Sequence, residues 1–312
     1  MVNRIEHRPY TVPRRQRGTA LTLGALLLLW FCLGTPPAAA VAAKETAPSS
    51  LDDPWERLDP GKLQLRSQAV LVVDQSGKPI YRKAAERSMP IASITKLMMA
   101  MVVLDAQVPL DQLVTIGNED RDLLRLTGSR LKSGKATLSR RNLLKIALMS
   151  SENRAAAALG RTTFPGGIQA FVGAMNRKAG ALGMDSSRFV DATGLDAGNV
   201  ASAEDLLKLV RAARAYPLIR QATTTPDTAV RPYKRRGELR YVNTNRLLKS
   251  DKWDIGLSKT GYVNESGRCL VMEATLYDRT LYIVLLNSFG KLTPFGDSNR
   301  LRKWIAQGLS KS

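Results

Sequence analysis

An apolar run without a charged residue, 19–33, is the first strong feature of the hydrophobic pattern, and it follows a cluster of three arginines. Two prolines end the run, and the small residues around Ala40 offer cleavage sites. A basic start, a short apolar stretch and a small-residue site are the three parts of an export signal. We therefore expect residues 1–40 to be a signal peptide, with cleavage possible up to Ala43. An uncleaved anchor is the alternative.

A single folded domain is predicted to follow over residues 63–312. Residues 41–62 before it are polar and proline-containing and lack periodicity, which predicts a leader. After this leader, the apolar runs 69–74 and 79–82 are separated by the turn sequence QSGK. Two such runs around a short turn predict a β-hairpin at the start of the domain.

The middle of the chain predicts helices. From Ser93 the segment SITKLMMAMVVLDA is apolar on nearly every side after its first turn, which indicates a helix enclosed by protein. Ser139 is suited to cap a second helix, which is interrupted at Ser150–Asn153 and then resumes. Further amphipathic helices are expected over Phe171–Leu182 and Ala203–Ala213.

Strand patterns return in the last third of the chain. Three runs separated by short polar turns predict an antiparallel meander: Ile255–Tyr262, Arg268–Leu276 and Thr280–Asn287. A closing helix is expected over Asp297–Leu309. With a hairpin at one end, a meander at the other and helices between, the simplest architecture is an α+β fold whose single antiparallel sheet is completed by both ends.

The inventory of reactive side chains removes several classes of enzyme. His7 is the only histidine and lies in the expected signal peptide, so the mature chain has no Ser-His-Asp triad, Cys-His dyad or usual histidine-containing zinc site. Glycine-rich nucleotide motifs are absent as well. We therefore expect no cofactor and no metal. Cys269 has no mature partner for a disulfide, and a buried free thiol is the expectation.

The chain carries a formal net charge of +20. For an exported protein this charge favours contact with an anionic membrane or with the carboxylates of the cell wall rather than with nucleic acid. A surface that only increases solubility is the alternative.

Ser93 and Lys96 lie three residues apart at the start of the enclosed helix, so their side chains can touch. Burial disfavours a charged lysine and lowers its pKa, which would let Lys96 take the proton of Ser93. The sequence SRLK, from Ser129 to Lys132, has the same spacing. It lies in a polar stretch where nothing would exclude water from the lysine, so we interpret it as a chance match.

Two further short motifs carry polar side chains suited to catalysis. Ser151-Glu152-Asn153 lies in the break between two helices, where a helix cap is the simpler interpretation. Lys259-Thr260-Gly261 lies on the first strand of the meander, where lysine and threonine could bind a carboxylate or carbonyl and glycine allows close approach. A surface turn is the alternative for this tripeptide.

In this order, the SITK, SEN and KTG sequences resemble the three motifs of penicillin-binding proteins and serine β-lactamases. Longer stretches are similar to low-molecular-mass D-alanyl-D-alanine peptidases: PIASITKLM, SENRAAAALG, FVDATGLDAGNVASAEDLLKLV, YVNTNRLL and KTGYVNESGRCLVM. The resemblance covers roughly residues 65–290. It implies a five-stranded antiparallel sheet flanked by helices, a mainly helical subdomain and a cleft between them.

The resemblance also implies roles for the motif residues. Ser93 would be acylated by a D-alanyl carbonyl, with Lys96 and Ser151 handling protons. Asn153, Lys259, Thr260 and Gly261 would bind the substrate. The backbone N–H groups of Ser93 and Tyr262 would form the oxyanion hole. Which residue is the base in acylation is disputed across the family.

Among these peptidases, the chain looks most like the penicillin-binding protein 7 type of endopeptidase, because it ends soon after the meander and has NESGRCLVM after KTG. This type implies hydrolysis of D-alanyl cross-links in peptidoglycan, covalent inhibition by β-lactam antibiotics and a periplasmic location. A D-alanyl-D-alanine carboxypeptidase is the first alternative, and a non-catalytic penicillin-binding sensor is the second.

Overall fold

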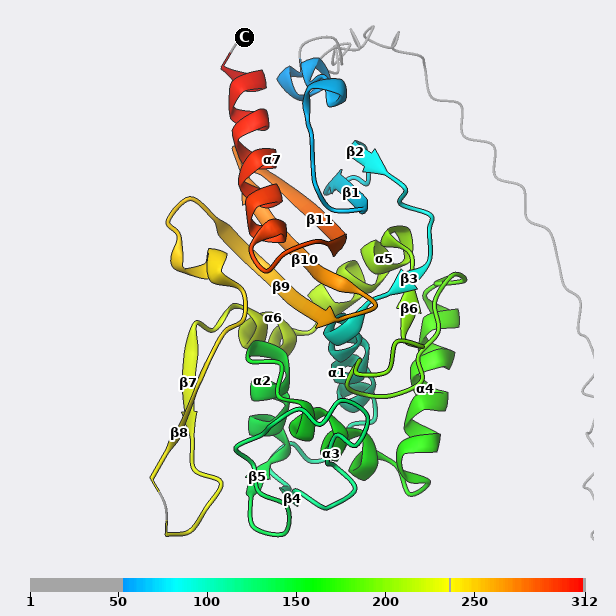
Figure 1. Ribbon diagram of the computed structural model, residues 1–312, viewed down its shortest axis with the longest axis vertical. Helices are drawn as coiled ribbons and strands as arrows, with labels where there is room; N and C mark the ends of the chain where they lie inside the picture. Colours follow the sequence, from blue (N-terminus) through cyan, green and yellow to red (C-terminus); the bar gives the residue numbers. More distant parts are fainter. Residues whose placement is uncertain (1–52, 236, 311–312) are drawn as a thin grey trace, which may run out of the picture. The chain divides into compact units, whose positions relative to one another are not determined.

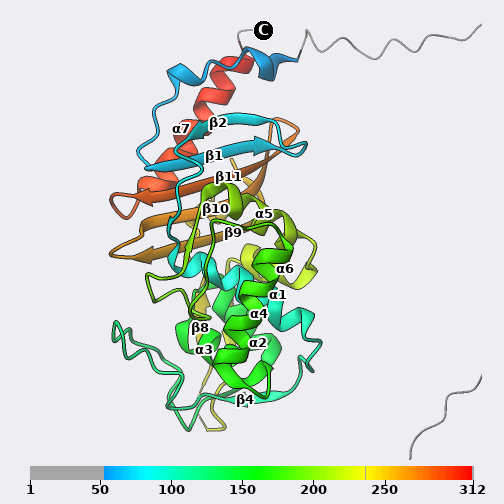
Figure 2. The same cartoon turned by 90° about the vertical axis from the view of Figure 1, so that its right-hand side faces the viewer.

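A computed structural model describes residues 53–235 and 237–310, so the expected signal peptide and most of the expected leader lie outside the described residues. A five-stranded antiparallel sheet forms from both ends of the domain, in the order β2-β1-β11-β10-β9 (Figures 1 and 2). Its strands are β1 (Ala69–Asp74), β2 (Pro79–Lys83), β9 (Asp254–Val263), β10 (Gly267–Leu276) and β11 (Arg279–Ser288). The predicted hairpin and meander are confirmed, and β1 joins them by pairing with β11.

Alternation along the strands separates two hydrophobic layers. In β1, Val70 and Val72 belong to one buried cluster, and Leu71 and Val73 belong to the other. Successive side chains of a strand point to opposite faces, so a sheet covered on both faces needs apolar residues at every position of its inner strands. The unbroken AVLVV run of β1 meets this requirement.

The closing helix α7 (Thr293–Leu309) covers one face of the sheet with Leu301, Trp304 and Ile305. It begins four residues before the expected start because Pro294 fits the first turn of a helix, where no backbone N–H is needed. Two 3-10 turns, Pro54–Arg57 and Pro60–Lys62, belong to the segment expected as a leader. The first of them packs against α7, so the packed structure extends to the N-terminal side of residue 63.

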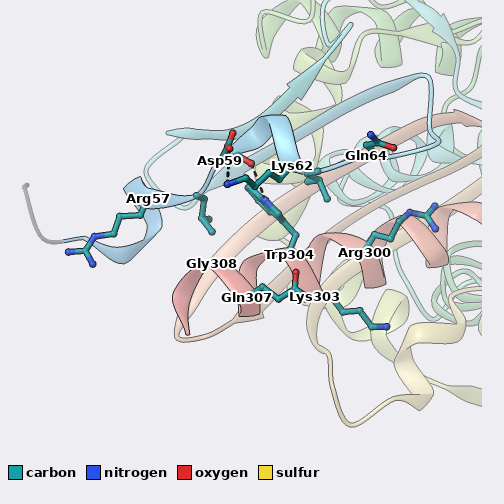
Figure 3. Close-up of a pocket in the computed structure, with 11 residues that line it drawn as sticks. Arg57, Asp59, Lys62, Gln64, Arg300, Lys303, Trp304, Gln307 and Gly308 are labelled. Carbon is teal, nitrogen blue, oxygen red and sulfur yellow. Dashed lines mark hydrogen bonds and ion pairs between the residues drawn. The ribbon is translucent and has the colours of Figure 1, made fainter. Parts of the chain in front are cut away.

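A hollow of about 550 Å³ lies where these turns meet α7. At this junction the indole Nε1 of Trp304 donates a hydrogen bond to the carbonyl oxygen of Asp59 at 3.1 Å. Figure 3 shows Arg57, Arg300 and Lys303 pointing away from one another, while Lys62 pairs with Asp59. Since a binding site needs polar groups that converge, we interpret the hollow as the seam between two packed segments.

Helices cover the other face of the sheet and form the second subdomain: α1 (Thr95–Asp105), α2 (Arg140–Met149), α3 (Asn153–Thr163), α4 (Gly167–Ala181), α5 (Ala203–Arg214) and α6 (Pro217–Thr224). Residues 95–103 of α1 are all buried, and α1 contacts each of the other five helices. The enclosed helix is thus confirmed, as is the cap of α2 by Ser139, whose Oγ accepts from the backbone N–H of Asn142. Helix α6 was not expected.

Short elements complete the helical subdomain. They include the strand pairs β3 (Met89–Pro90) with β6 (Val200–Ala201), β4 (Leu113–Thr115) with β5 (Thr137–Ser139), and β7 (Asp227–Val230) with β8 (Leu239–Val242). The 3-10 turns Ala92–Ile94 and Arg246–Lys249 precede α1 and β9. Within the part of the chain that the structure describes, no helix is both long enough and apolar enough to cross a bilayer.

Candidate active site

A cleft of about 480 Å³ brings the three motifs together where β9 meets the helical subdomain. Its lining includes residues from every motif and from five other segments: Ser93, Thr127, Ser151, Asn153, Leu195, Thr244, Arg246, Thr260, Gly261, Tyr262, Arg268, Cys269, Lys291, Leu292, Pro294 and Phe295. Lys96 and Lys259 lie behind this surface, and both are almost fully buried.

A bend just before α1 presents Ser93 to the cleft. Ala92 has a φ of 48°, in the left-handed region that residues with a Cβ rarely adopt. Gly194 packs so closely on this bend that a Cβ there would lie 2.0 Å from the carbonyl oxygen of Ala92. Backbone strain of this kind persists only where the surroundings enforce it, and it is typical of functional sites.

Lys96 lies one helical turn after Ser93 and reaches back to it. Its Nζ lies 2.9 Å from Ser93 Oγ, 2.8 Å from Asn153 Oδ1 and 2.5 Å from the carbonyl oxygen of Thr193. Burial lowers the pKa of Lys96 from its ordinary 10.5 to about 8, although the charges of Asp191 and Glu152 oppose this change. An appreciable fraction of Lys96 is therefore neutral near pH 8.

Ser151 lies in the break between α2 and α3 and has a φ of 61°. Its Oγ accepts a hydrogen bond from Lys259 Nζ at 3.1 Å. Burial lowers the pKa of Lys259 well below its ordinary value, and the nearby charge of Lys96 lowers it further. The SEN sequence thus supplies a side chain to the cleft as well as the start of α3.

The KTG motif lies on the edge strand β9, next to Ser93. Lys259 Nζ also donates to the carbonyl oxygen of Thr260 at 2.9 Å, and Thr260 Oγ1 donates to Thr244 Oγ1 at 2.6 Å. A Cβ on Gly261 would lie 2.7 Å from the carbonyl oxygen of Ile91 and 3.2 Å from the backbone nitrogen of Ser93. Glycine at this position therefore allows β9 to lie close to the backbone of residues 91–93, the bend that carries Ser93.

The rim of the cleft is basic and aromatic. The guanidinium of Arg268 lies 3.5 Å from the centre of the Tyr262 ring, and the phenol of Tyr262 donates to Asn264 Oδ1 at 2.9 Å. Cys269 is a buried free thiol, as expected. Burial raises its pKa to about 11, which keeps it protonated at neutral pH. In contrast to the buried Lys96 of the SITK motif, Lys132 of the SRLK sequence is exposed.

Several residues of the site were not predicted from the sequence. Thr193 accepts from Lys96, Thr244 accepts from Thr260, and Thr127 accepts from Asn153 Nδ2 at 3.2 Å. Thr193 and Thr244 lie in ATGLDAGN and YVNTNRLL, two of the stretches that carry the family resemblance. Thr127 lies in a polar loop whose sequence has no recognisable motif.

A family model described as D-alanyl-D-alanine carboxypeptidase matches residues 57–290, three quarters of the chain, including all three motifs. The chain belongs to this family. Its members are serine peptidases, so the protein is a serine hydrolase of the penicillin-binding type, as the sequence motifs imply. Throughout the described residues no cluster of histidine, cysteine, aspartate and glutamate is arranged to hold a metal ion.

Relatives within the family are similar over most of their length. A D-alanyl-D-alanine endopeptidase of Pseudomonas aeruginosa is 44% identical over 284 residues, which cover 91% of this chain and 88% of the relative. The D-alanyl-D-alanine endopeptidase of Escherichia coli is 40% identical over 285 residues, with the same two coverages. The crystal structure of the Streptomyces K15 DD-transpeptidase superposes with a TM-score of 0.72 at 25% identity, covering 78% of this chain and 98% of that one. The expected α+β peptidase fold is confirmed.

Proposed function

We propose that the protein is a serine D-alanyl-D-alanine endopeptidase that hydrolyses peptide cross-links of peptidoglycan through an acyl-enzyme on Ser93. The main support is the contact of 2.9 Å between Ser93 Oγ and Lys96 Nζ. Lys96 is buried, and this burial lowers its pKa to about 8. The names of the relatives from Pseudomonas aeruginosa and Escherichia coli support cleavage of cross-links.

In acylation, neutral Lys96 takes the proton of Ser93 as Ser93 Oγ attacks the D-alanyl carbonyl carbon. The backbone N–H groups of Ser93 and Tyr262 stabilise the resulting oxyanion. When the C–N bond breaks, the leaving amine must gain a proton. Ser151 is suited to supply it, because its Oγ already accepts from Lys259 and its own hydrogen is therefore free to point into the cleft. Ser151 then recovers a proton from Lys96.

Water completes the cycle by attacking the ester carbon of the acyl-enzyme. Its proton passes to Lys96, the ester C–O bond breaks and Ser93 recovers its hydrogen, so each group returns to its starting state. Asn153, Thr260 and Gly261 hold the peptide in the cleft in this scheme. The rings of β-lactam antibiotics would be opened by the same attack and leave a covalent adduct on Ser93.

The signal peptide expected over residues 1–40 would direct the protein to the periplasm and would be removed on export. The substrate is the cross-linked stem peptide of the wall, and the basic surface would favour its carboxylates or an anionic membrane over other partners. Nucleic acid is not a partner in this proposal. Neither a metal nor a cofactor takes part in any step.

Two experiments test the proposal. Fluorescent penicillin should label the purified protein, and the Ser93→Ala variant should remain unlabelled. Digestion of purified sacculi, followed by chromatography of the released muropeptides, should show loss of cross-linked dimers. If dimers stay intact while pentapeptide stems are trimmed, the protein is a carboxypeptidase. If the label persists without turnover of any peptide, it is a sensor.

A further inference from the structure

The side-chain amide of Asn153 contacts Lys96 with its oxygen and Thr127 with its nitrogen. The oxygen accepts from Lys96 Nζ at 2.8 Å, and Nδ2 donates to Thr127 Oγ1 at 3.2 Å. The two ends of an amide have nearly the same shape, so hydrogen-bond partners decide which end faces which neighbour. The hydrogen bond that Thr127 makes with Asn153 therefore decides whether Lys96 faces the oxygen or the nitrogen of the Asn153 amide.

Thr127 is bonded to Asp122 within the loop between β4 and β5. Its Oγ1 donates to Asp122 Oδ2 at 2.7 Å, and the carboxylate also accepts from the backbone N–H groups of Leu124, Arg125 and Thr127. Partial burial raises the pKa of Asp122, but these hydrogen bonds outweigh it and leave the pKa below its ordinary value. An ionised carboxylate only accepts, so the single hydrogen of the Thr127 hydroxyl belongs to Asp122.

The direction of these hydrogen bonds, from Asn153 through Thr127 to Asp122, determines the hydrogen bonds of Lys96. Because Thr127 Oγ1 can only accept from Asn153, the amide nitrogen must face Thr127 and the amide oxygen must face Lys96. A neutral lysine amine has two hydrogens and one lone pair. The carbonyl oxygen of Thr193 and Asn153 Oδ1 accept the two hydrogens, which leaves the lone pair for Ser93 Oγ at 2.9 Å.

We propose that Asp122 is a positioning residue for the reaction: through Thr127 it holds the Asn153 amide with its oxygen toward Lys96, so that the lone pair of neutral Lys96 faces Ser93 alone. The inference rests on the proposed function, since it concerns the proton that Ser93 loses. Asp122 lies outside all three family motifs.

The loop that carries Asp122 is fastened to two other walls of the site. Arg125 Nε donates to the carbonyl oxygen of Leu195 at 2.5 Å, and its guanidinium pairs with Glu265 in the β9–β10 turn at 2.8 Å. These contacts hold Thr127 in register with Asn153. A reversal of the amide would instead direct Nδ2 at Lys96, where it would compete with Ser93 for the lone pair.

The Thr127→Val and Thr127→Ser variants test the inference. Valine keeps the shape of threonine but can neither accept from Asn153 nor donate to Asp122, whereas serine keeps the hydroxyl. We expect Thr127→Val to lower the rate constant for acylation by benzylpenicillin about tenfold or more, because the partly buried amide of Asn153 loses a hydrogen-bond partner, and Thr127→Ser to retain most of the wild-type rate. Thr115→Val, which removes a hydroxyl contact of the β4–β5 pair, is the matched control and should acylate at the wild-type rate.

The pH profile separates positioning from loosening of the loop. The titratable groups that interact with Lys96 are Asp191 and Glu152, whose charges raise its pKa, and Lys259, a second buried lysine whose own pKa the charge of Lys96 lowers. In Thr127→Val nothing holds Nδ2 of Asn153 away from Lys96, so conformers with the amide reversed become accessible. An amide nitrogen turned toward Lys96 disfavours the ammonium form, so the acid limb of the acylation profile should move to lower pH. A loosened loop would admit water and move the limb to higher pH, toward the ordinary lysine value.

Wild-type rates in Thr127→Val, or an acid limb that moves upward, would overturn the inference. If Thr127→Val shows no cooperative thermal transition, Asp122→Asn replaces it. An amide at position 122 can donate to Thr127, which would reverse the direction of the hydrogen bonds from residue 122 to Asn153. We expect this variant to show the same slowing of acylation and the same shift of the acid limb to lower pH. Failure of the proposed function is distinguishable, because Ser93→Ala would then still be labelled by penicillin.

Discussion

Replacement of Lys96 by methionine should stabilise the folded protein at neutral pH while it abolishes acylation. Lys96 is fully buried, and its pKa in the folded protein is about 8 against 10.5 when solvated. Below pH 8 both the folded and the unfolded chain carry the proton, and the folded state bears the full cost of a buried charge. From the two pKa values this cost is about 3 kcal/mol.

The sign of the pH dependence follows from the same two values. Between pH 8 and 10.5 the unfolded chain binds the proton of Lys96 and the folded chain does not, so the contribution of Lys96 to the free energy of unfolding of the wild type rises with pH. The Lys96→Met variant lacks this rise. Its loss of hydrogen bonds to Thr193 and Asn153, about 1–3 kcal/mol, acts at all pH values and opposes the gain. Removing Lys96 also removes a charge that disfavours the ammonium form of Lys259, which further stabilises the folded variant below pH 8.

Urea unfolding at pH 7 and pH 10 measures the effect. The free energy of unfolding of Lys96→Met relative to wild type should fall by about 2.5 kcal/mol between the two pH values. Lys132→Met, which changes the exposed lysine of the SRLK sequence, is the matched control and should show no such fall. If the difference between Lys96→Met and wild type is the same at both pH values, Lys96 does not bear a desolvation cost, and its assignment as the base loses its physical basis.

Three further predictions concern the site and the fold. The rate of acylation of Ser93 by benzylpenicillin, followed by stopped-flow fluorescence, should rise with pH through about 8, as Lys96 loses its proton; a flat profile from pH 6 to 9 contradicts this. Gly261→Ala should slow acylation at least tenfold and lower the free energy of unfolding in urea by about 1–3 kcal/mol, because its Cβ would lie too close to Ile91 and Ser93. Acylation at the wild-type rate would show that β9 can shift to accommodate the Cβ at no cost. Trp304→Ala should lower the free energy of unfolding by about 3–5 kcal/mol while penicillin labelling at 20 °C persists; a loss below 1 kcal/mol would mean that α7 adds little to the sheet.

Local sequence patterns were sufficient for the main elements of the fold. The AVLVVD run and the three runs of the meander are short apolar runs bounded by turn residues, as buried strands are. The segment after Ser93 is longer and apolar on nearly every side, as an enclosed helix is. Helix α6 was missed because Pro217–Thr224 is short, and the β7–β8 hairpin was missed because its strands are partly exposed and have few apolar residues. Short elements of this kind depend on tertiary contacts more than on their own pattern.

The candidate site divides in the same way. Ser93 and Lys96 could be paired from the sequence because three residues on a helix start span one turn, and family resemblance extended the set to the SEN and KTG residues. Nothing local predicted that Thr193, Thr244 or Thr127 would accept hydrogen bonds from these groups. Their partners are 16 to 97 residues away along the chain.

The sequence by itself determined which chemistry was available: without a mature histidine, a serine enzyme had to use another base, and a segment apolar on nearly every side placed Ser93 and Lys96 at the start of an enclosed helix. Only the tertiary structure decided how that chemistry is controlled. The pKa of Lys96 depends on how completely the other helices exclude water from it, and the direction of its lone pair depends on a hydrogen-bond chain that begins at Asp122. Both are properties of contacts between distant segments, which no local pattern encodes.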